Sequence, residues 1–479
     1  MQFNSIEYML FLPSVVCLYF LMPYKFRPYF LLLASYGFYI YWKAEYAAII
    51  VAITLLGYGA GLLIGNDSYD SKRNYIFTIS IIGIISFLLV FKYSNFLIGN
   101  LNLLFHHNLN INTPPMQLLL PLGISFYTFQ ALSYVIDVYK RQREVEKNIV
   151  HFALYVTFFP QLFAGPITRS SMLLPQIKTR QGFDYEKFVD GLILIAWGLL
   201  KKIVIADRIA MVIEPIFNHP RVFSSTALFI SAVFYSYQIY CDFSGYSDIA
   251  IGSAKLFGYD LMWNFETPYH SRSLREFWQR WHISLSTWFR DYVYIPLGGN
   301  RVTKARRLWN LFATFLLSGL WHGANWTFVV WGMIHGLLLI IGILLANVNK
   351  RLAALISLHR VPRLHKCLQI VYTFILVTFA WIFFRSGSIK EAWRYITYMF
   401  KNTGGAHYLD YNIDTTQVLI ILVYIIFLEF IQNVQKNEKL RSYLLAKPTA
   451  ARWSFYVITL LSVILVGKFG DNKFIYFNF

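Results

Sequence analysis

The sequence predicts an all-α polytopic membrane protein, and its composition and its long apolar runs carry this prediction. Of the 479 residues, 57% are hydrophobic and 14% are charged, whereas a soluble domain has about 25% charged residues. Apolar runs recur from end to end, and many approach the roughly 20 residues that a helix needs to cross a bilayer. We expect a funnel-like bundle of about 11–13 transmembrane helices, in a single integral-membrane domain over residues 1–479.

The expected spans fall into two groups. The first group lies at about 6–22, 28–42, 46–64, 75–91, 117–138 and 149–164. The second group lies at about 308–320, 325–347, 367–385, 416–434 and 452–469. A basic connection precedes residue 308 and another follows residue 347, so we expect the spans 308–320 and 325–347 to form a hairpin.

Between residues 150 and 270 the regular alternation of spans fails. Pro and Gly interrupt the apolar run Phe158–Arg169, and the short run Leu192–Leu200 continues directly into Lys201 and Lys202. Irregular backbone at membrane depth is tolerated only where it is buried in protein or lines a wet cavity. We therefore expect re-entrant or broken helices here and a cavity in the middle of the fold.

Basic residues gather in the short connections and predict the orientation. The chain has 43 Lys and Arg against 24 Asp and Glu, a net charge of +19. The positive-inside rule explains most of this excess without nucleic acid as a partner, and it puts Tyr139–Lys147, Arg301–Arg307 and Lys350–Lys366 on the cytoplasmic side. By alternation the N-terminus and the C-terminal tail, residues 470–479, then lie outside.

Two histidines stand in an otherwise apolar stretch, Ser318–Gly336. His322 and His335 are surrounded there by Trp, Gly and aliphatic residues. An imidazole at membrane depth is costly and usually has a task or a partner, and its pKa suits proton transfer near neutrality. From the residues alone, a hydrogen-bonded packing role stays open for both, more so for His335.

Residues 272–292 show the pattern of an amphipathic helix at the cytoplasmic interface. One face carries Leu274, Phe277, Trp278, Trp281, Leu285, Trp288 and Tyr292, and the other carries Arg272, Arg275, Gln279, His282, Ser286 and Arg290. This helix could anchor in lipid, or its arginines could hold the phosphates of an acyl donor. The residues that we expect to bind such a donor are Arg275, Arg290, Asn300 and Arg301.

Other signals limit the chemistry. Cys17, Cys241 and Cys367 are far apart and lack ligand spacing, so we expect no disulfide framework and no metal site. The sequence has no Gly-x-Ser-x-Gly and no His-Glu-x-x-His pattern. Asp242 and Asp248 could form a proton path, as in a transporter, or be structural acids paired with Lys255 or with helix ends.

Three stretches resemble the membrane-bound O-acyltransferase (MBOAT) family, in particular the bacterial branch typified by the alginate O-acetylation membrane subunit. They are Phe277–Tyr292, Tyr294–Arg301 and Gly319–Gly323. The resemblance implies that the donor is acetyl-CoA or another acyl thioester, used from the cytoplasmic side, and that no cofactor is permanently bound. It matches the family's catalytic histidine to His322 and a supporting histidine to His335.

The C-terminal segment Phe474–Phe479 resembles a tail motif of cell-envelope acylation systems, which implies that Tyr476 accepts the acyl group before onward transfer. The expected function is O-acetylation of an exported polysaccharide from the bacterial inner membrane. The expected partners are membrane lipid and an outer-side acyltransferase or the polysaccharide itself. The alternatives are D-alanyl transfer to a wall polymer such as teichoic acid and, in a different class, a transporter or channel.

Overall fold

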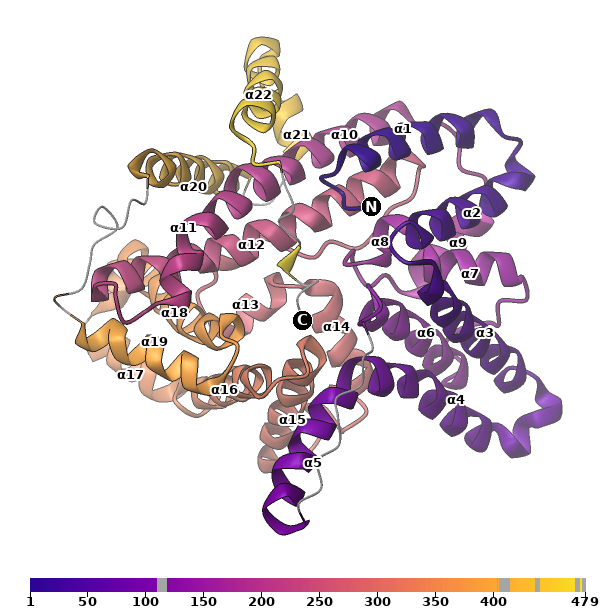
Figure 1. The fold of residues 1–479 in the computed structure, drawn as a ribbon, viewed down its shortest axis with the longest axis horizontal. Coiled ribbons are helices and arrows are strands. Elements are labelled where there is room, and N and C mark those ends of the chain that lie inside the picture. The colour runs from indigo at the N-terminus through magenta and orange to yellow at the C-terminus, as the bar shows by residue number, and fades with distance from the viewer. Residues whose placement is uncertain are drawn as a thin grey trace. The chain divides into compact units, whose positions relative to one another are not determined.

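The computed structural model describes residues 1–109, 119–355, 357–402, 404, 414–435, 440–469 and 474–475. Within these residues every regular element is helical, which confirms the all-α prediction (Figure 1). The chain separates into two compact units, residues Met1–Ile195 with Tyr246–Met262 and residues Ala196–Gly245 with Trp263–Phe479. Each unit is described by itself, and the single membrane domain expected over residues 1–479 stays a prediction.

The first unit contains the N-terminal helices. They are α1 (Ile6–Leu21), α2 (Arg27–Ile40), α3 (Ala47–Ile64), α4 (Arg73–Leu88), α5 (Ser94–Leu109), α6 (Ile124–Tyr139), α7 (Ile149–Thr157), α8 (Phe159–Leu162), α9 (Ser170–Lys178) and most of α10 (Tyr185–Leu199). Helices α3, α4 and α6 pack against one another, and α2 packs against α7. Phe38, Tyr127, Tyr134 and Phe152 are fully buried there, so large aromatic rings fill this core.

The break expected after residue 157 is confirmed. Helix α7 ends at Thr157, and the short α8 begins at Phe159. The freed backbone groups find partners inside the protein, because Phe159 N–H donates to Ser35 Oγ at 3.1 Å. The Gln161 side-chain amide donates to the Tyr155 carbonyl at 2.8 Å. This satisfies the condition for non-helical backbone away from water.

The second unit contains the later helices. They are α11 (Asp207–Asn218), most of α12 (Ser225–Leu256), α13 (Leu274–Arg280), α14 (Ile283–Phe289), α15 (Lys304–His322), α16 (Trp326–Leu344), α17 (Ala346–Leu355), α18 (Pro362–Arg385), α19 (Ile389–Lys401), α20 (Thr415–Gln435), α21 (Leu440–Leu445) and α22 (Thr449–Leu461). The most extensive helix pair is α15 with α16, and α18 packs on α16. The hairpin expected between residues 308 and 347 is therefore confirmed.

Six helices in the described part of the chain are long and apolar enough to cross a membrane, so the protein is a multi-pass membrane protein. They are Ala44–Ile64, Asp67–Leu104, Trp326–Leu344, Pro362–Arg385, Thr415–Val434 and Thr449–Val466. Other expected spans form shorter helices, such as the 16-residue apolar α1. The sidedness expected from the basic connections stays a prediction.

The expected continuous helix over residues 272–292 is wrong in one respect, because it is broken at its centre. Helix α13 ends at Arg280 and α14 begins at Ile283, with His282 between them in the left-handed region at φ +43°. The segment before α13 supplies the competing hydrogen bonds. Ile283 N–H donates to the Asn264 carbonyl at 2.9 Å, and Glu266 N–H donates to the Arg280 carbonyl at 3.0 Å.

Candidate active site

Helices α15 and α16 and the short turn between them place both histidines of the predicted site. The Thr303 hydroxyl accepts from Arg306 N–H and begins α15, while the Asn325 side chain accepts from Thr327 N–H at 3.1 Å and begins α16. Gly323 is extended and ends α15 directly after His322. Side-chain caps of this kind satisfy the free N–H groups at a helix start.

Two glycines let the helices of this hairpin approach closely. A Cβ added at Gly319 would lie 2.3 Å from the Phe328 carbonyl oxygen, and one at Gly332 would lie 2.4 Å from the Phe315 carbonyl oxygen. Any side chain at either position would force the backbones apart. Small residues at such crossings are how helices pack closely in lipid, where apolar surface alone gives little driving force.

The close crossing brings His322 and His335 to one indole ring. His322 is 2% exposed and its ring centroid lies 5.0 Å from that of Trp331, while His335 is fully buried and its ring centroid lies 4.9 Å from the same indole. Phe384 of α18 also contacts the His322 ring, at 5.3 Å between centroids. The two predicted histidines therefore belong to one buried aromatic cluster.

Hydrogen bonding assigns the tautomer of His335. The Trp278 Nε1–H donates to His335 Nδ1 at 3.3 Å, so Nδ1 is the acceptor and the ring proton is on Nε2. No hydrogen-bond partner for Nε2 lies among the residues that the structure describes. His335 is thus held in place through one of its two ring nitrogens.

A cavity of about 330 Å³ lies beside this cluster in the same unit. Its walls come from α13, α14, the π-helical turn Arg290–Tyr294 and α15. Trp278 lines the cavity and also donates to His335. Ser318 lines it one helical turn before His322. The cavity therefore shares side chains and a helix with the histidine cluster.

The structure brings three of the four residues expected to bind a donor to this cavity or next to it. Arg275 and Arg290 line the cavity. Asn300 lies beside it, because its side-chain oxygen accepts from the hydroxyl of Tyr294, a lining residue, at 2.7 Å. Arg301 is exposed and is not part of the lining. Two guanidinium groups thus face a cavity whose other walls are largely apolar and aromatic.

His282 was expected on the polar face of an interfacial helix, and this expectation is wrong. Its side chain is fully buried between Phe243, at 4.6 Å between ring centroids, and Trp321, at 6.1 Å. His282 Nδ1 lies 3.4 Å from the Asn264 side-chain oxygen. Burial lowers the pKa of His282 to about 3, so the ring is neutral. Helical periodicity could not reveal this, because the helix breaks at this residue.

The acid Asp242 belongs to a buried ion cluster, with a partner other than the expected Lys255. Lys202 Nζ lies 2.6 Å from Asp242 Oδ1 and 2.8 Å from Asp207 Oδ1, and all three side chains are buried. Lys255 instead pairs with Asp190 in the first unit. Buried charges persist where partners and hydrogen bonds compensate their lost hydration, so Asp242 is engaged structurally.

The same carboxylate holds the C-terminal tail. Ile475 N–H donates to Asp242 Oδ2 at 2.7 Å, and the buried Phe474 ring packs against Phe243 at 5.7 Å between centroids. Phe243 in turn contacts His282. Tyr476, the expected acyl acceptor, follows Ile475 in the chain but lies outside the described residues.

The structure also shows which side chains could hold a metal ion or a ligand. Among the side chains that it describes, no cluster of three or more His, Cys, Asp or Glu residues is arranged to hold a metal ion. The groups able to hold a ligand beside the histidines are the guanidinium groups of Arg275 and Arg290 and the polar side chains of Gln279, Ser286 and Thr314. Such a set suits an anionic substrate.

The protein thus has a buried histidine pair beside an arginine-lined cavity, within a set of membrane-crossing helices. Comparison with known families identifies the class of membrane enzyme to which it belongs. The profile of the membrane-bound O-acyltransferase family, MBOAT, matches residues 139–386. The chain belongs to this family and is an acyltransferase.

Curated relatives extend the match over most of the chain. A protein named "Probable alginate O-acetylase AlgI" from Azotobacter vinelandii is 40% identical over 409 residues, which are 84% of this chain and 78% of the relative. A peptidoglycan O-acetyltransferase from Helicobacter pylori is 35% identical, over 80% of this chain and 76% of its own length. A teichoic acid D-alanyltransferase from Bacillus subtilis is 29% identical, over 57% of this chain and 70% of its own length.

Burial of neutral His282 predicts that acid destabilises the protein. A folded-state pKa near 3 against an ordinary 6.5 means that the unfolded chain binds the extra proton, so this contribution is present above about pH 6.5 and is lost as the pH falls below it. Lowering the pH from about 7 to about 5 should cost roughly 2 kcal/mol at this residue. The thermal unfolding midpoint of His282→Gln, measured in detergent, should therefore fall less over this pH change than that of the parent protein does. The matched control is His219→Gln, at an exposed histidine. An equal acid-induced drop in both variants and the parent would refute the assignment.

Proposed function

We propose that this protein is a membrane O-acetyltransferase that takes an acetyl group from acetyl-CoA at the cytoplasmic face of the bacterial inner membrane. The group is passed on for O-acetylation of an exported polysaccharide. The observation that carries the proposal is the arginine-lined cavity that meets the His322 and His335 cluster through Trp278 and α15. The names of the alginate and peptidoglycan relatives support the acetyl group and the polysaccharide.

The donor enters with its phosphates at Arg275 and Arg290 and its thioester toward the histidines. Guanidinium groups bind phosphate through paired, charge-assisted hydrogen bonds. The remaining lining mixes aromatic side chains such as Trp278, Phe289 and Phe315 with aliphatic and hydroxyl-bearing ones, which suits the uncharged arm that carries the acetyl group. Holding the thioester away from water limits hydrolysis of the acyl group.

His322 acts as the general base. Its imidazole removes the proton from an acceptor hydroxyl while that oxygen attacks the thioester carbonyl carbon. The new C–O bond forms, the C–S bond breaks, and the imidazolium returns its proton to the departing thiolate. A tyrosine hydroxyl with an ordinary pKa near 10 needs such assistance at neutral pH. His335, held by Trp278, fixes the Trp331 ring against which His322 packs.

The acceptor half of the reaction uses the C-terminal tail. In this proposal the Tyr476 hydroxyl takes the acetyl group and an outer-side acyltransferase or the polysaccharide receives it next. The hydrogen bond from Ile475 N–H to Asp242 supports the proposal, because it fixes the backbone of the residue that precedes Tyr476. Phe243 contacts both Phe474 and His282, and His282 in turn contacts the ring of Trp321, the neighbour of His322.

A second candidate is transfer of a D-alanyl group to a wall polymer. The teichoic acid D-alanyltransferase relative favours it. That match covers less of this chain, at lower identity, than the alginate and peptidoglycan relatives do, so acetyl transfer ranks first. A donor screen separates the two, since one donor is acetyl-CoA and the other is an aminoacyl thioester.

Replacing His322 tests the base. His322→Ala should lower polymer acetylation by a factor of about 10² or more, because positioned general bases contribute roughly that much, while the protein still inserts in the membrane. The assay is transfer of labelled acetyl from acetyl-CoA in membranes. His365→Ala, at a histidine outside the lining of the cavity beside the histidine cluster, is the matched control and should retain activity. Full activity in His322→Ala would remove this residue from the mechanism.

Replacing Arg290 tests the donor cavity. Arg290→Ala should raise KM for acetyl-CoA about tenfold or more with a smaller effect on kcat, because it removes a charged contact made equally in ground and transition states. Arg301→Ala, at an exposed arginine outside the cavity lining, should leave KM nearly unchanged. The reverse ranking of the two variants would place the donor elsewhere.

Replacing Tyr476 tests the relay. Protein incubated with labelled acetyl-CoA should carry label on the peptide after Lys473, and Tyr476→Phe should lose both this label and polymer acetylation, since phenylalanine has no hydroxyl to acylate. Ile475→Pro provides a graded comparison, because proline has no N–H to donate to Asp242, while the buried ion cluster and the Tyr476 hydroxyl are kept. It should slow label transfer without abolishing it. Unchanged polymer acetylation in Tyr476→Phe would rule the relay out.

A further inference from the structure

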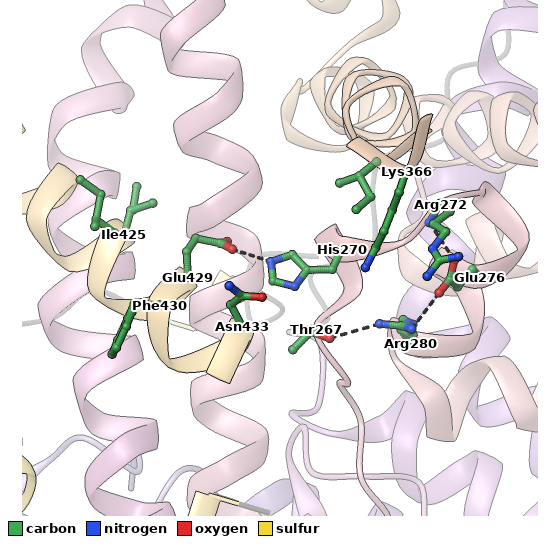
Figure 2. Close-up of a pocket in the computed structure, with 12 residues that line it drawn as sticks. Thr267, His270, Arg272, Glu276, Arg280, Lys366, Ile425, Glu429, Phe430 and Asn433 are labelled. Carbon is green, nitrogen blue, oxygen red and sulfur yellow. Dashed lines mark hydrogen bonds and ion pairs between the residues drawn. The ribbon is translucent and has the colours of Figure 1, made fainter. Parts of the chain in front are cut away.

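A second cavity, of about 720 Å³, lies in the second unit and has no part in the proposed acyl transfer. It is enclosed by the first turns of α18, the last turns of α20 and the segment from Thr267 to Arg280 (Figure 2). None of its lining residues lines the cavity beside the histidines. It is therefore a separate site, which we call the α18–α20 cavity.

The charged side chains of the α18–α20 cavity leave a positive excess. The cations are Arg272, Arg280 and Lys366, the acids are Glu276 and Glu429, and His270 adds an imidazole. Both acids are engaged, since Glu276 pairs with Arg280 at 2.7 Å and Glu429 contacts His270 Nε2 at 2.6 Å. In the part of the chain that the structure describes, the side chains of Arg272 and Lys366 have no acidic partner within 4.0 Å.

The apolar part of the wall belongs to two long apolar helices. Ile370 comes from α18, and Ile425, Ile426 and Phe430 come from α20. Both helices are long and apolar enough to span a bilayer. Phe430 is 59% exposed and Ile426 is 68% exposed, so this wall is open to an apolar chain beside the helices. In Figure 2 the α20 side chains stand opposite Lys366, whose amine extends toward His270.

The charged and apolar parts lie at the depth expected of a lipid headgroup and its chain. Lys366 is near the start of α18, and Glu429 and Asn433 are near the end of α20, so the polar groups are at one end of both spans. Anionic headgroups bind basic pockets between membrane helices at this level. A free anion would contact the cations but would leave the apolar side chains of the wall uncovered.

We propose that the α18–α20 cavity binds an anionic membrane phospholipid, with its phosphate at Arg272 and Lys366 and an acyl chain along Ile370, Ile425 and Phe430. Arginine supplies paired hydrogen bonds to two phosphate oxygens and lysine adds a point charge. The bound lipid joins α18 to α20 at one end of the spans. Because α18 carries Phe384 against His322, the lipid supports one wall of the histidine cluster.

The experiment measures lipid retention directly and does not depend on acyl transfer. The full-length protein is purified in detergent and titrated with phosphatidylglycerol or phosphatidylcholine of the same chain length, and bound lipid is counted by native mass spectrometry. We expect preferential retention of phosphatidylglycerol and a raised unfolding midpoint. Lys366→Glu should weaken this retention by about tenfold or more, because it replaces an attraction by a repulsion at the headgroup.

Matched variants and competitors decide the outcome. Arg363→Glu makes the same charge change on the same helix, three residues before Lys366 and outside the cavity lining, and should retain phosphatidylglycerol. If Lys366→Glu does not fold, Lys366→Gln, which removes the charge alone, gives the same ranking against Arg363→Gln. Equal retention of both lipids, or equal loss in the Arg363 variant, overturns the proposal. Full competition by inorganic phosphate assigns the site to a free anion, and displacement by acetyl-CoA assigns it to the donor.

Discussion

The close crossing of α15 and α16 at Gly319 and Gly332 is the constraint on which the site depends. Because no side chain separates the two backbones there, His322 at the end of one helix and His335 within the other meet the same Trp331 ring. Lipid gives little driving force for helix association, so this contact relies on backbone proximity and packing. The shape of the cavity beside the histidines depends on the same crossing, because α15 forms one of its walls.

Polar groups at depth in the second unit are compensated by neighbours distant in sequence. Lys202 is bound by two carboxylates, and one of these also accepts the backbone N–H of Ile475. Removing either acid would leave a buried ammonium group partly uncompensated, which is far more costly than the pair itself is stabilising. The tail, α12 and the π-helical turn Leu200–Ala206 are thereby joined through one cluster.

Local patterns in the sequence predicted much of this, and non-local contacts limited the rest. The all-α class, the hairpin and the break at Phe158 follow from run length, basic connections and Pro, which act over a few residues. The break at His282 depends on hydrogen bonds that the Asn264 carbonyl accepts and Glu266 N–H donates, and neither residue belongs to the helical repeat. Lys202, the partner of Asp242, is likewise 40 positions away along the chain. The sequence alone could not show that Asp242 pairs with Lys202 and not with the expected Lys255. Among the residues expected to bind a donor, the basic pattern could not separate Arg275 and Arg290, which line the cavity, from Arg301, which does not, because the cavity lining depends on how α13, α14 and the following turn pack together.

Helix α15 combines two faces that differ in their tolerance to mutation. Toward α16, Gly319 meets a carbonyl oxygen so closely that even alanine would displace the backbone. Toward the cavity, Leu311, Thr314 and Ser318 line open space and touch no such constraint. A substitution on the α16 face therefore disturbs the histidine hairpin, whereas a substitution on the other face changes the volume and polarity of the cavity. Where the cavity holds the acyl donor, as proposed above, exchanging a few side chains on this one stripe changes which acyl group fits and leaves the hairpin intact.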